Sequence, residues 1–460
     1  MFIVALLFAC ITVFFDLFPI SYTSFLVVLL QLSMNIYSTN QTITGRATIT
    51  LYEFDWKMIE AIDQEMRKRK LTCTIVVGDS TFGNPDLFYV VGANIARGGV
   101  FIKIKSQPPL IIVSNIDVGS AEKGRVKRVE TYSDYEYDRI VMQHGLAKAR
   151  GVLYDKILRR LRVRGRIGFY GKTDLSQGIS AIDFLRRKKH KVVGENTPTL
   201  LDALRETKDE TEISRIREIG RRTEKIVEQT TQFLRNCTVR NKELFDAEKP
   251  VTVGMVKSLI GRLTAEQNLI NTNGLIFSVG RDSADPHNEG RDQDRVREGL
   301  PIVFDIFPQE PGGYWFDTTR TYVIGKASDE IRRMHETVLE AQLLALDELR
   351  AGVDGRTVTE RVCRVFEKKG YKTPRDLAKG DVEAKTTGFI HSLGHGIGLT
   401  IGERPSLSVI THQELQEGHV TSVEPGLYKP GIGGVRIEDA VVIRKRGIEN
   451  LSTLRKDLEI

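Results

Sequence analysis

The sequence predicts an α/β domain over residues 52–203, followed over residues 204–460 by a domain that mixes helices and strands. In the first part, short β-branched runs alternate with helical patterns, which is typical of an α/β domain. In the second part, a long helical stripe precedes helices and strands that glycines interrupt. A chain of 460 residues with 41% hydrophobic and 28% charged residues can bury a large core.

Local patterns predict the elements of the first domain. Met58, Ile62 and Met66 recur at helical spacing, so an amphipathic helix is expected there. Gln107-Pro-Pro109 separates two apolar runs, which predicts a hairpin or a tight connection. We predict helices over residues 54–70 and 139–161, and strands over residues 72–77, 87–91, 100–105, 110–114 and 166–170.

The first 50 residues form an apolar extension with three readings. Residues 1–32 carry one charge, Asp16, and are long enough to span a bilayer. The first basic residue is Arg46, so the stretch lacks the basic start of a signal peptide and a positive flank. Either the start codon is assigned too far upstream, or the stretch is a membrane anchor or a cleaved signal peptide. Membrane contact is expected only if residues 1–32 are a real anchor.

Charge and cysteine content suggest neither a nucleic-acid partner nor disulfides. The net charge of +7 is spread over the chain, and the basic runs 156–166 and 186–191 lack interleaved aromatic residues. We therefore expect solvated helix faces and strand edges there. The four cysteines contain no C-x-x-C pair, which predicts buried thiols in a reducing, cytoplasmic setting. They are Cys10, Cys73, Cys237 and Cys363.

The second domain is expected to begin near residues 200–209 with a long helix. From Glu212 onward, Ile213, Ile216 and Ile219 lie along one stripe of this helix. Every residue that we identify with catalytic chemistry follows it.

Two aspartates flank a predicted hairpin. Apolar runs around Asp305 and Asp317 are separated by Pro311-Gly312-Gly313, which is a hairpin signal. If the turn centres on Pro311, the aspartates lie opposite each other, with Cβ atoms about 4.5–5.5 Å apart. They would then be close enough to share a metal pair. Alternatively, each aspartate ends its strand.

Two histidines lie in the glycine-rich segment Gly388-Phe-Ile-His391-Ser-Leu-Gly-His395-Gly-Ile-Gly398. The glycines let backbone and ligands approach closely, and they favour a loop or strand edge over a helix. Two of the chain's eight histidines within this frame indicate a functional site.

Two more carboxylates come from residues 420–428 and 431–443. Glu424 precedes a Pro-Gly turn, and Glu438 lies in a predicted strand. Strand alternation places Arg436 and Glu438 on one face. An inward-facing arginine is suited to binding a substrate carboxylate or carbonyl.

Asp305, Asp317, His395, Glu424 and Glu438 together form a hard, oxygen-rich ligand set. Such a set favours Mn²⁺, Co²⁺ or Fe²⁺ over a thiolate-type zinc site. Without metal, crowded carboxylates would repel one another, whereas two divalent cations would cancel the charge and hold a hydroxide between them. We expect two divalent ions, Mn²⁺ or Co²⁺ first, with Fe²⁺ and Zn²⁺ as alternatives.

These motifs, in this order, resemble those of the pita-bread metallopeptidases, which include methionine aminopeptidases, aminopeptidase P and prolidases. Residues 391–399, 422–428 and 434–439 are most similar to the Xaa-Pro branch. The resemblance implies an α/β creatinase-like N-terminal domain and an α+β pita-bread catalytic domain. It also implies a homodimeric metallo-exopeptidase that hydrolyses Xaa-Pro bonds, in which a metal-bridging hydroxide attacks the scissile carbonyl. It does not separate a dipeptidase from an aminopeptidase.

The resemblance implies a role for each metal ligand. Asp305 resembles the bidentate ligand of one metal, and Asp317 and Glu438 resemble the bridging carboxylates. His395 and Glu424 resemble ligands of the other metal.

It also implies roles toward the substrate. Glu424 matches the position of the general acid/base, and His287 matches a histidine that contacts substrate. His391 matches the histidine near the leaving group, and Arg436 matches the substrate-anchoring arginine.

Two departures from the family pattern leave an alternative open. Gly402 stands where the family has a histidine that helps to stabilise the tetrahedral intermediate. Losing one such donor can cost about 2.7–4 kcal/mol. The alternative is therefore a catalytically impaired, metal-binding module. Asp305 and Asp317 are also one residue further apart than is common, which a bulge over residues 308–313 can absorb. Metal-free creatinase-like chemistry is disfavoured because it does not need five ligands.

Overall fold

The computed structural model describes residues 45–460. The described residues up to Ile62 belong to one compact unit, and Asp63–Ile460 form a second. Helix α3 (Gly45–Lys68) begins before the predicted start at residue 54 and ends close to the predicted place. None of the described helices has the length and apolar character needed to cross a membrane. The apolar stretch 1–32 lies outside the described residues, so the three interpretations of it stay predictions.

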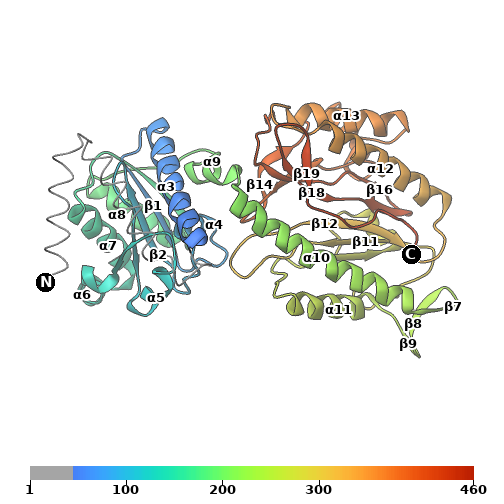
Figure 1. Ribbon diagram of the computed structural model, residues 1–460, viewed down its shortest axis with the longest axis horizontal. Helices are drawn as coiled ribbons and strands as arrows, with labels where there is room; N and C mark the ends of the chain where they lie inside the picture. Colours follow the sequence, from blue (N-terminus) through green and yellow to red (C-terminus); the bar gives the residue numbers. More distant parts are fainter. Residues whose placement is uncertain (1–44) are drawn as a thin grey trace, which may run out of the picture. The chain divides into compact units, whose positions relative to one another are not determined.

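A six-stranded mixed sheet, ordered β4-β3-β2-β1-β5-β6, organises the first part of the second unit (Figure 1). Its strands are β1 (Cys73–Gly78), β2 (Gly99–Ile104), β3 (Leu110–Val113), β4 (Arg128–Thr131), β5 (Arg166–Lys172) and β6 (Lys191–Val193). Strand β1 pairs antiparallel with β2 and parallel with β5. Strands β2 and β3 pair antiparallel across the connection predicted at Gln107-Pro-Pro109.

Helices pack against this sheet and bury its apolar face. They are α4 (Pro85–Val91), α5 (Val118–Ala121), α6 (Tyr137–His144), α7 (Leu146–Arg160) and α8 (Leu175–Arg187). Ile140, Leu153 and Leu185, from the last three of these helices, share one core cluster with the strands. The helix predicted over residues 139–161 is two helices, because the chain turns at Gly145, where φ is 73°.

Residues 87–91 form a helix, so the predicted strand is wrong. Helix α4 begins after Asn84, whose side chain accepts a hydrogen bond from the backbone N–H of Leu87, and it ends at left-handed Gly92. All five predicted strand residues are buried. A short run that is apolar on every side has no periodicity to separate helix from strand. The Asn-Pro start and the glycine stop are the local helix signals.

The second part begins with α9 (Leu200–Glu206) and the long helix α10 (Glu210–Asn236), close to the predicted start at Glu212. Asp209 and Glu212 cap α10 reciprocally. The remaining helices are α11 (Val253–Glu266), α12 (Asp329–Glu348), α13 (Gly355–Lys368) and α14 (Pro374–Ala378).

The strands of the second part form four sheets, ordered β7-β8-β9, β10-β11-β12, β14-β13-β15-β18-β19 and β16-β17. They are β7 (Thr238–Arg240), β8 (Glu243–Asp246), β9 (Lys249–Pro250), β10 (Ile276–Val279), β11 (Pro301–Ile306), β12 (Thr318–Val323), β13 (Gly394–Ile397), β14 (Ile401–Leu407), β15 (Val420–Val423), β16 (Gly426–Lys429), β17 (Gly433–Arg436), β18 (Asp439–Ile443) and β19 (Ile448–Asn450). Helices α12 and α13 lie above the strands in Figure 1, and α11 lies below them. Buried residues of α12 and α13 share one core cluster with β15–β18.

The described cysteines are unpaired, as predicted. Cys73 and Cys363 are buried and Cys237 is half-buried, while Cys10 lies outside the described residues. Burial raises the pKa of both buried thiols to about 12, which keeps them protonated and unreactive.

Candidate metal centre and active site

The two aspartates lie on one face of the β11–β12 pair, but they are not directly opposite each other. Asp305 pairs with Thr319, and the bridge between Gln309 and Trp315 continues the same register. The turn therefore centres on Gly312, where φ is 67°, and not on Pro311 as expected. Glycine reaches this left-handed conformation readily. The one-residue shift makes Asp305 and Asp317 diagonal neighbours, and both are buried.

His395 reaches the site from β13 because its glycine neighbours let strands approach closely. A Cβ at Gly394 would lie 2.0 Å from the backbone oxygen of Ser422, and one at Gly396 would lie 2.3 Å from that of Arg404. Side chains at either position would push the neighbouring strand away. The predicted role of the glycine frame is thereby given a physical cause.

Glu424 and Glu438 follow from the pairing of β15 with β18. Val423 pairs with Asp439, so the two glutamates lie at the same level, just beyond the last strand pair. The Ser422 hydroxyl donates a hydrogen bond to Glu424 Oε1 (3.0 Å) and accepts one from the backbone N–H of His395 (3.0 Å). One serine thus fixes both residues.

Ligand atoms from three chain segments converge. One ligand atom each from Asp317, His395 and Glu438 lies within 4.8 Å of the others. His395 Nε2 lies 3.3 Å from Glu424 Oε1 and 3.7 Å from Asp317 Oδ2. The structure therefore gathers three of the four predicted carboxylate ligands around the His395 imidazole. Asp305 adjoins them through Arg436.

Arg436 binds protein groups with every nitrogen of its guanidinium. It donates to Asp305 Oδ2 (2.6 Å), to the Tyr428 hydroxyl (2.7 Å), to Thr319 Oγ1 (3.2 Å) and to a backbone carbonyl. The Thr319 hydroxyl in turn donates to Glu438 Oε2 (2.7 Å). This geometry favours a role in orienting the carboxylates, and direct contact of Arg436 with substrate stays a prediction.

A second buried arginine supports the same strands from behind. Arg320 donates to the backbone carbonyls of Thr319, Glu438, Leu454 and Arg455. It also pairs with Asp439 Oδ1 at 2.8 Å. It therefore ties β12 and β18 to the C-terminal segment.

Burial and crowding raise the pKa values of three of these carboxylates. Burial, and then the neighbouring carboxylates, raise the pKa values of Asp317 and Glu438 well above their ordinary range. Burial, with a contribution from Asp305, raises the pKa of Glu424 to about 7. A group of acids this close and this buried is electrostatically unfavourable without a compensating cation.

The residues present fit such a cation. Asp305 Oδ1, Asp317 Oδ1 and Glu438 Oε1 are buried and accept no hydrogen bond. Buried oxygens without a donor are uncommon in folded proteins, and a metal ion is one of the groups that satisfies them. The set of carboxylates and one imidazole suits hard divalent ions.

The predicted substrate histidines line the same space. His391 Nδ1 lies 2.8 Å from the Ser392 carbonyl, so this nitrogen carries the proton, and Nε2 lies 3.0 Å from the Tyr428 hydroxyl. Burial, with a contribution from Arg436, lowers the pKa of His391 to about 3, so the imidazole is neutral at physiological pH. His287 is exposed at the rim.

A single cavity of about 560 Å³ contains all eight predicted site residues in its lining. The sequence did not identify Tyr428, Thr319 or Ser422, whose hydroxyl groups hold the predicted site residues in place. Tyr428 and Ser422 lie within the motifs that pointed to the site, but a hydroxyl gives no distinctive spacing signal. Gly402 is exposed, with φ 81° and no atom within 4 Å of a Cβ placed there.

The chain is similar to known metallopeptidases. Residues 214–445 match metallopeptidase family M24. Over 230 residues the chain is 33% identical to an Xaa-Pro dipeptidase of Pyrococcus furiosus, which covers 48% of this chain and 61% of that protein. It is 27% identical over 383 residues to an Xaa-Pro dipeptidase of Pyrococcus horikoshii, which covers 82% and 92%.

A solved structure shows the fold. The Xaa-Pro dipeptidase from Bacillus anthracis matches with a TM-score of 0.70 at 23% identity, over 88% of this chain and all of that chain. The predicted architecture, an α/β N-terminal domain with a pita-bread catalytic domain, is confirmed. The alignment with the first relative spans less than two thirds of that protein's length.

Proposed function

The chain belongs to metallopeptidase family M24, and from this premise we propose that it is a dinuclear metal-dependent exopeptidase acting on Xaa-Pro bonds. Its substrates would be dipeptides or the amino termini of peptides. The observation that carries the proposal is the convergence of Asp317, His395, Glu424 and Glu438 in one cavity, with Asp305 beside them. The two Pyrococcus relatives, named as Xaa-Pro dipeptidases, support the substrate class.

Two divalent cations, Mn²⁺ or Co²⁺ first, would be held by Asp305, Asp317, His395, Glu424 and Glu438. When bound, such ions neutralise the acids, polarise the scissile carbonyl and lower the pKa of a water molecule to near neutrality. The buried oxygens without donors support this assignment.

The chain's own residues then position the substrate and move its protons. Glu424 accepts the proton of the attacking water and delivers it to the leaving amine. Ser422 orients that carboxylate by donating to Oε1. Neutral His391 would lie near the leaving group, and the rim residue His287 would contact the substrate. The low pKa of His391 makes it a hydrogen-bonding partner and not the proton donor.

The direct test is hydrolysis of Xaa-Pro substrates by protein stripped with chelator and reloaded with Mn²⁺ or Co²⁺. We expect metal-dependent release from Ala-Pro or from an Xaa-Pro-extended peptide, little release from Ala-Ala, and loss of release in Glu424→Gln. Absence of chelator-sensitive release with either metal would end the proposal.

One observation favours a second candidate, a metal-binding module with impaired catalysis. Gly402 provides no hydrogen-bond donor from a side chain, and the space around it is open. This candidate predicts metal-dependent thermal stabilisation without turnover. Because φ is 81°, any side chain at this position strains the backbone. Gly402→Ala therefore controls for strain, and only Gly402→His should raise activity if the missing imidazole limits the rate.

We further propose a homodimer in the reducing cytoplasm. The dimer is an expectation from the family, and the unpaired thiols support the compartment. Light scattering on the purified chain tests the first, since a monomeric mass at working concentration contradicts it.

A further inference from the structure

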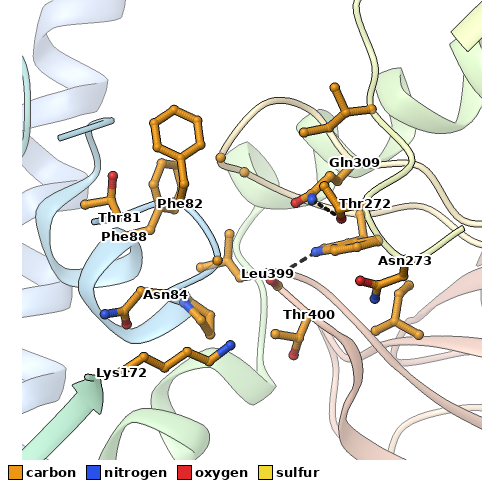
Figure 2. Close-up of a pocket in the computed structure, with 17 residues that line it drawn as sticks. Thr81, Phe82, Asn84, Phe88, Lys172, Thr272, Asn273, Gln309, Leu399 and Thr400 are labelled. Atoms are coloured by element: carbon orange, nitrogen blue, oxygen red, sulfur yellow. Dashed lines mark hydrogen bonds between the residues drawn. The ribbon is translucent and has the colours of Figure 1, made fainter. Parts of the chain in front are cut away.

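Figure 2 shows a second cavity, of about 360 Å³, which shares lining residues with the metal-site cavity. Asn273 and Ile401 line both cavities, so a group bound at the metal site can extend past them into the second space. The metal-site residues themselves do not line it.

The walls of the second cavity combine aromatic surface with one cation. Phe82, Phe88 and Trp315 provide the apolar surface. Lys172 is the one charged side chain among the described residues that line it, and no described residue forms an ion pair with it. In Figure 2, Lys172 extends along the edge of the cavity with its ammonium group toward Thr400. The cavity therefore suits a side chain with an apolar stem and an anionic end.

Hydrogen bonds hold these walls in place without a ligand. The Trp315 indole donates to the Leu399 carbonyl (3.1 Å), and its backbone N–H donates to the Gly398 carbonyl (2.8 Å). Asn94 donates to the Pro311 carbonyl (3.2 Å), which ties the loop between α4 and β2 to the β11–β12 turn. A site with prearranged walls loses little conformational entropy on binding.

The position of the cavity indicates which part of a substrate it takes. By the family resemblance, the leaving side of the substrate is expected near His391 and the substrate-anchoring Arg436. Neither of those two residues lines the second cavity.

We propose that this cavity binds the side chain of the substrate's N-terminal residue and, through Lys172, selects a carboxylate there. The inference rests on the proposed Xaa-Pro activity. It assigns acidic N-terminal residues, as in Glu-Pro, as preferred substrates over their neutral isosteres.

The test compares hydrolysis of Glu-Pro, Gln-Pro and Lys-Pro by the metal-loaded chain. In Lys172→Met, the ratio of kcat/KM for Glu-Pro to that for Gln-Pro should fall about fivefold, the upper range for a partly exposed ion pair. In Lys172→Glu, the preference should shift toward Lys-Pro. Lys123→Met, at another exposed lysine, should leave both ratios unchanged. Unaltered ratios in both Lys172 variants, with Ala-Pro still hydrolysed, overturn the inference and leave the proposed function standing.

A binding measurement separates the two failures. The chain has two tryptophans, so a Trp56→Phe background isolates the fluorescence of Trp315. Glu-Pro should change this fluorescence at a lower concentration than Gln-Pro, and Lys172→Met should abolish the difference. If the wild-type chain hydrolyses no Xaa-Pro dipeptide, the proposed function fails. The titration then decides on the cavity alone, and equal binding of Glu-Pro and Gln-Pro overturns it.

Discussion

Replacing Glu424 with glutamine should stabilise the metal-free chain at neutral pH and abolish its stabilisation by metal. The pKa of this carboxyl rises from an ordinary 4.5 to about 7, mainly through burial. As the pH rises, the unfolded state releases the Glu424 proton before the folded state does. The contribution of the protonated Glu424 carboxyl to folding stability is therefore complete below pH 4.5 and is lost as the pH rises through 7. At about 1.36 kcal/mol for each pKa unit, the loss above pH 7 is about 3 kcal/mol.

Glutamine cannot ionise and escapes this loss, while its amide oxygen still accepts the hydrogen bond from Ser422. Calorimetry on chelator-stripped protein at pH 8 should show a Tm roughly 3–4 °C above wild type. At pH 4.5 the two proteins should melt together. Saturating Mn²⁺ should reverse the order at pH 8, because only wild type gains the binding free energy.

Glu403→Gln is the matched control, since it makes the same substitution in a buried ion pair. Glu403 Oε1 lies 2.6 Å from Lys208 Nζ, and both side chains are almost fully buried. Removing the acid leaves the ammonium unpaired and should cost about 3–5 kcal/mol with or without metal. A metal-free Glu424→Gln protein that melts below wild type at pH 8 would refute the electrostatic reasoning.

Three further substitutions test other parts of the structure. Burial lowers the pKa of His419 to about 3. The stability that depends on neutral His419 is therefore complete above pH 6.5 and falls as the pH drops toward 3. At pH 5 the loss is about 2 kcal/mol. His419→Gln should flatten that pH dependence in urea titrations at pH 7 and pH 5, and an unchanged slope would contradict the assignment. Arg320→Met removes a donor from four backbone carbonyls and from Asp439, whose other oxygen keeps its ion pair with Lys456 (2.7 Å). The variant should lose about 1–3 kcal/mol of stability and bind Mn²⁺ more weakly by calorimetry. A variant as stable as wild type would show that these hydrogen bonds are dispensable. Gly394→Ala places a Cβ 2.0 Å from the backbone oxygen of Ser422 and should abolish Mn²⁺ binding. The control Gly194→Ala, in open space, should bind Mn²⁺ like wild type. Normal Mn²⁺ binding by both variants would show that the close approach of Gly394 to Ser422 is dispensable.

The ligand strands could be predicted because their signals are local. The glycines around His395 reflect how closely the neighbouring strands must approach, and this constraint falls on a few adjacent residues. The alternation around Glu438 predicted that this residue lies within a strand, which is wrong, because Glu438 lies in the break between β17 and β18. The register of Asp305 could not be predicted to the residue. It depends on whether Pro311 or Gly312 centres the turn, and both are common turn residues.

Interactions between distant segments were out of reach of sequence reasoning. Tyr428 links Arg436 to His391, and Thr319 links Arg436 to Glu438. These links exist only once three strands have assembled. The second cavity also depends on distant segments, because its walls come from residues as far apart in the sequence as Phe82, Lys172 and Trp315. Helix α4 was missed because burial on all sides removes the amphipathic pattern.

The central claim is that one cation pair neutralises these acids. Electron paramagnetic resonance of the chain titrated with Mn²⁺ tests it most directly, because two ions that share carboxylates are magnetically coupled. We expect two Mn²⁺ per chain with an exchange-coupled spectrum, which Asp317→Asn reduces to that of an isolated ion. Binding of a single uncoupled Mn²⁺ that Asp317→Asn leaves unchanged would contradict the account.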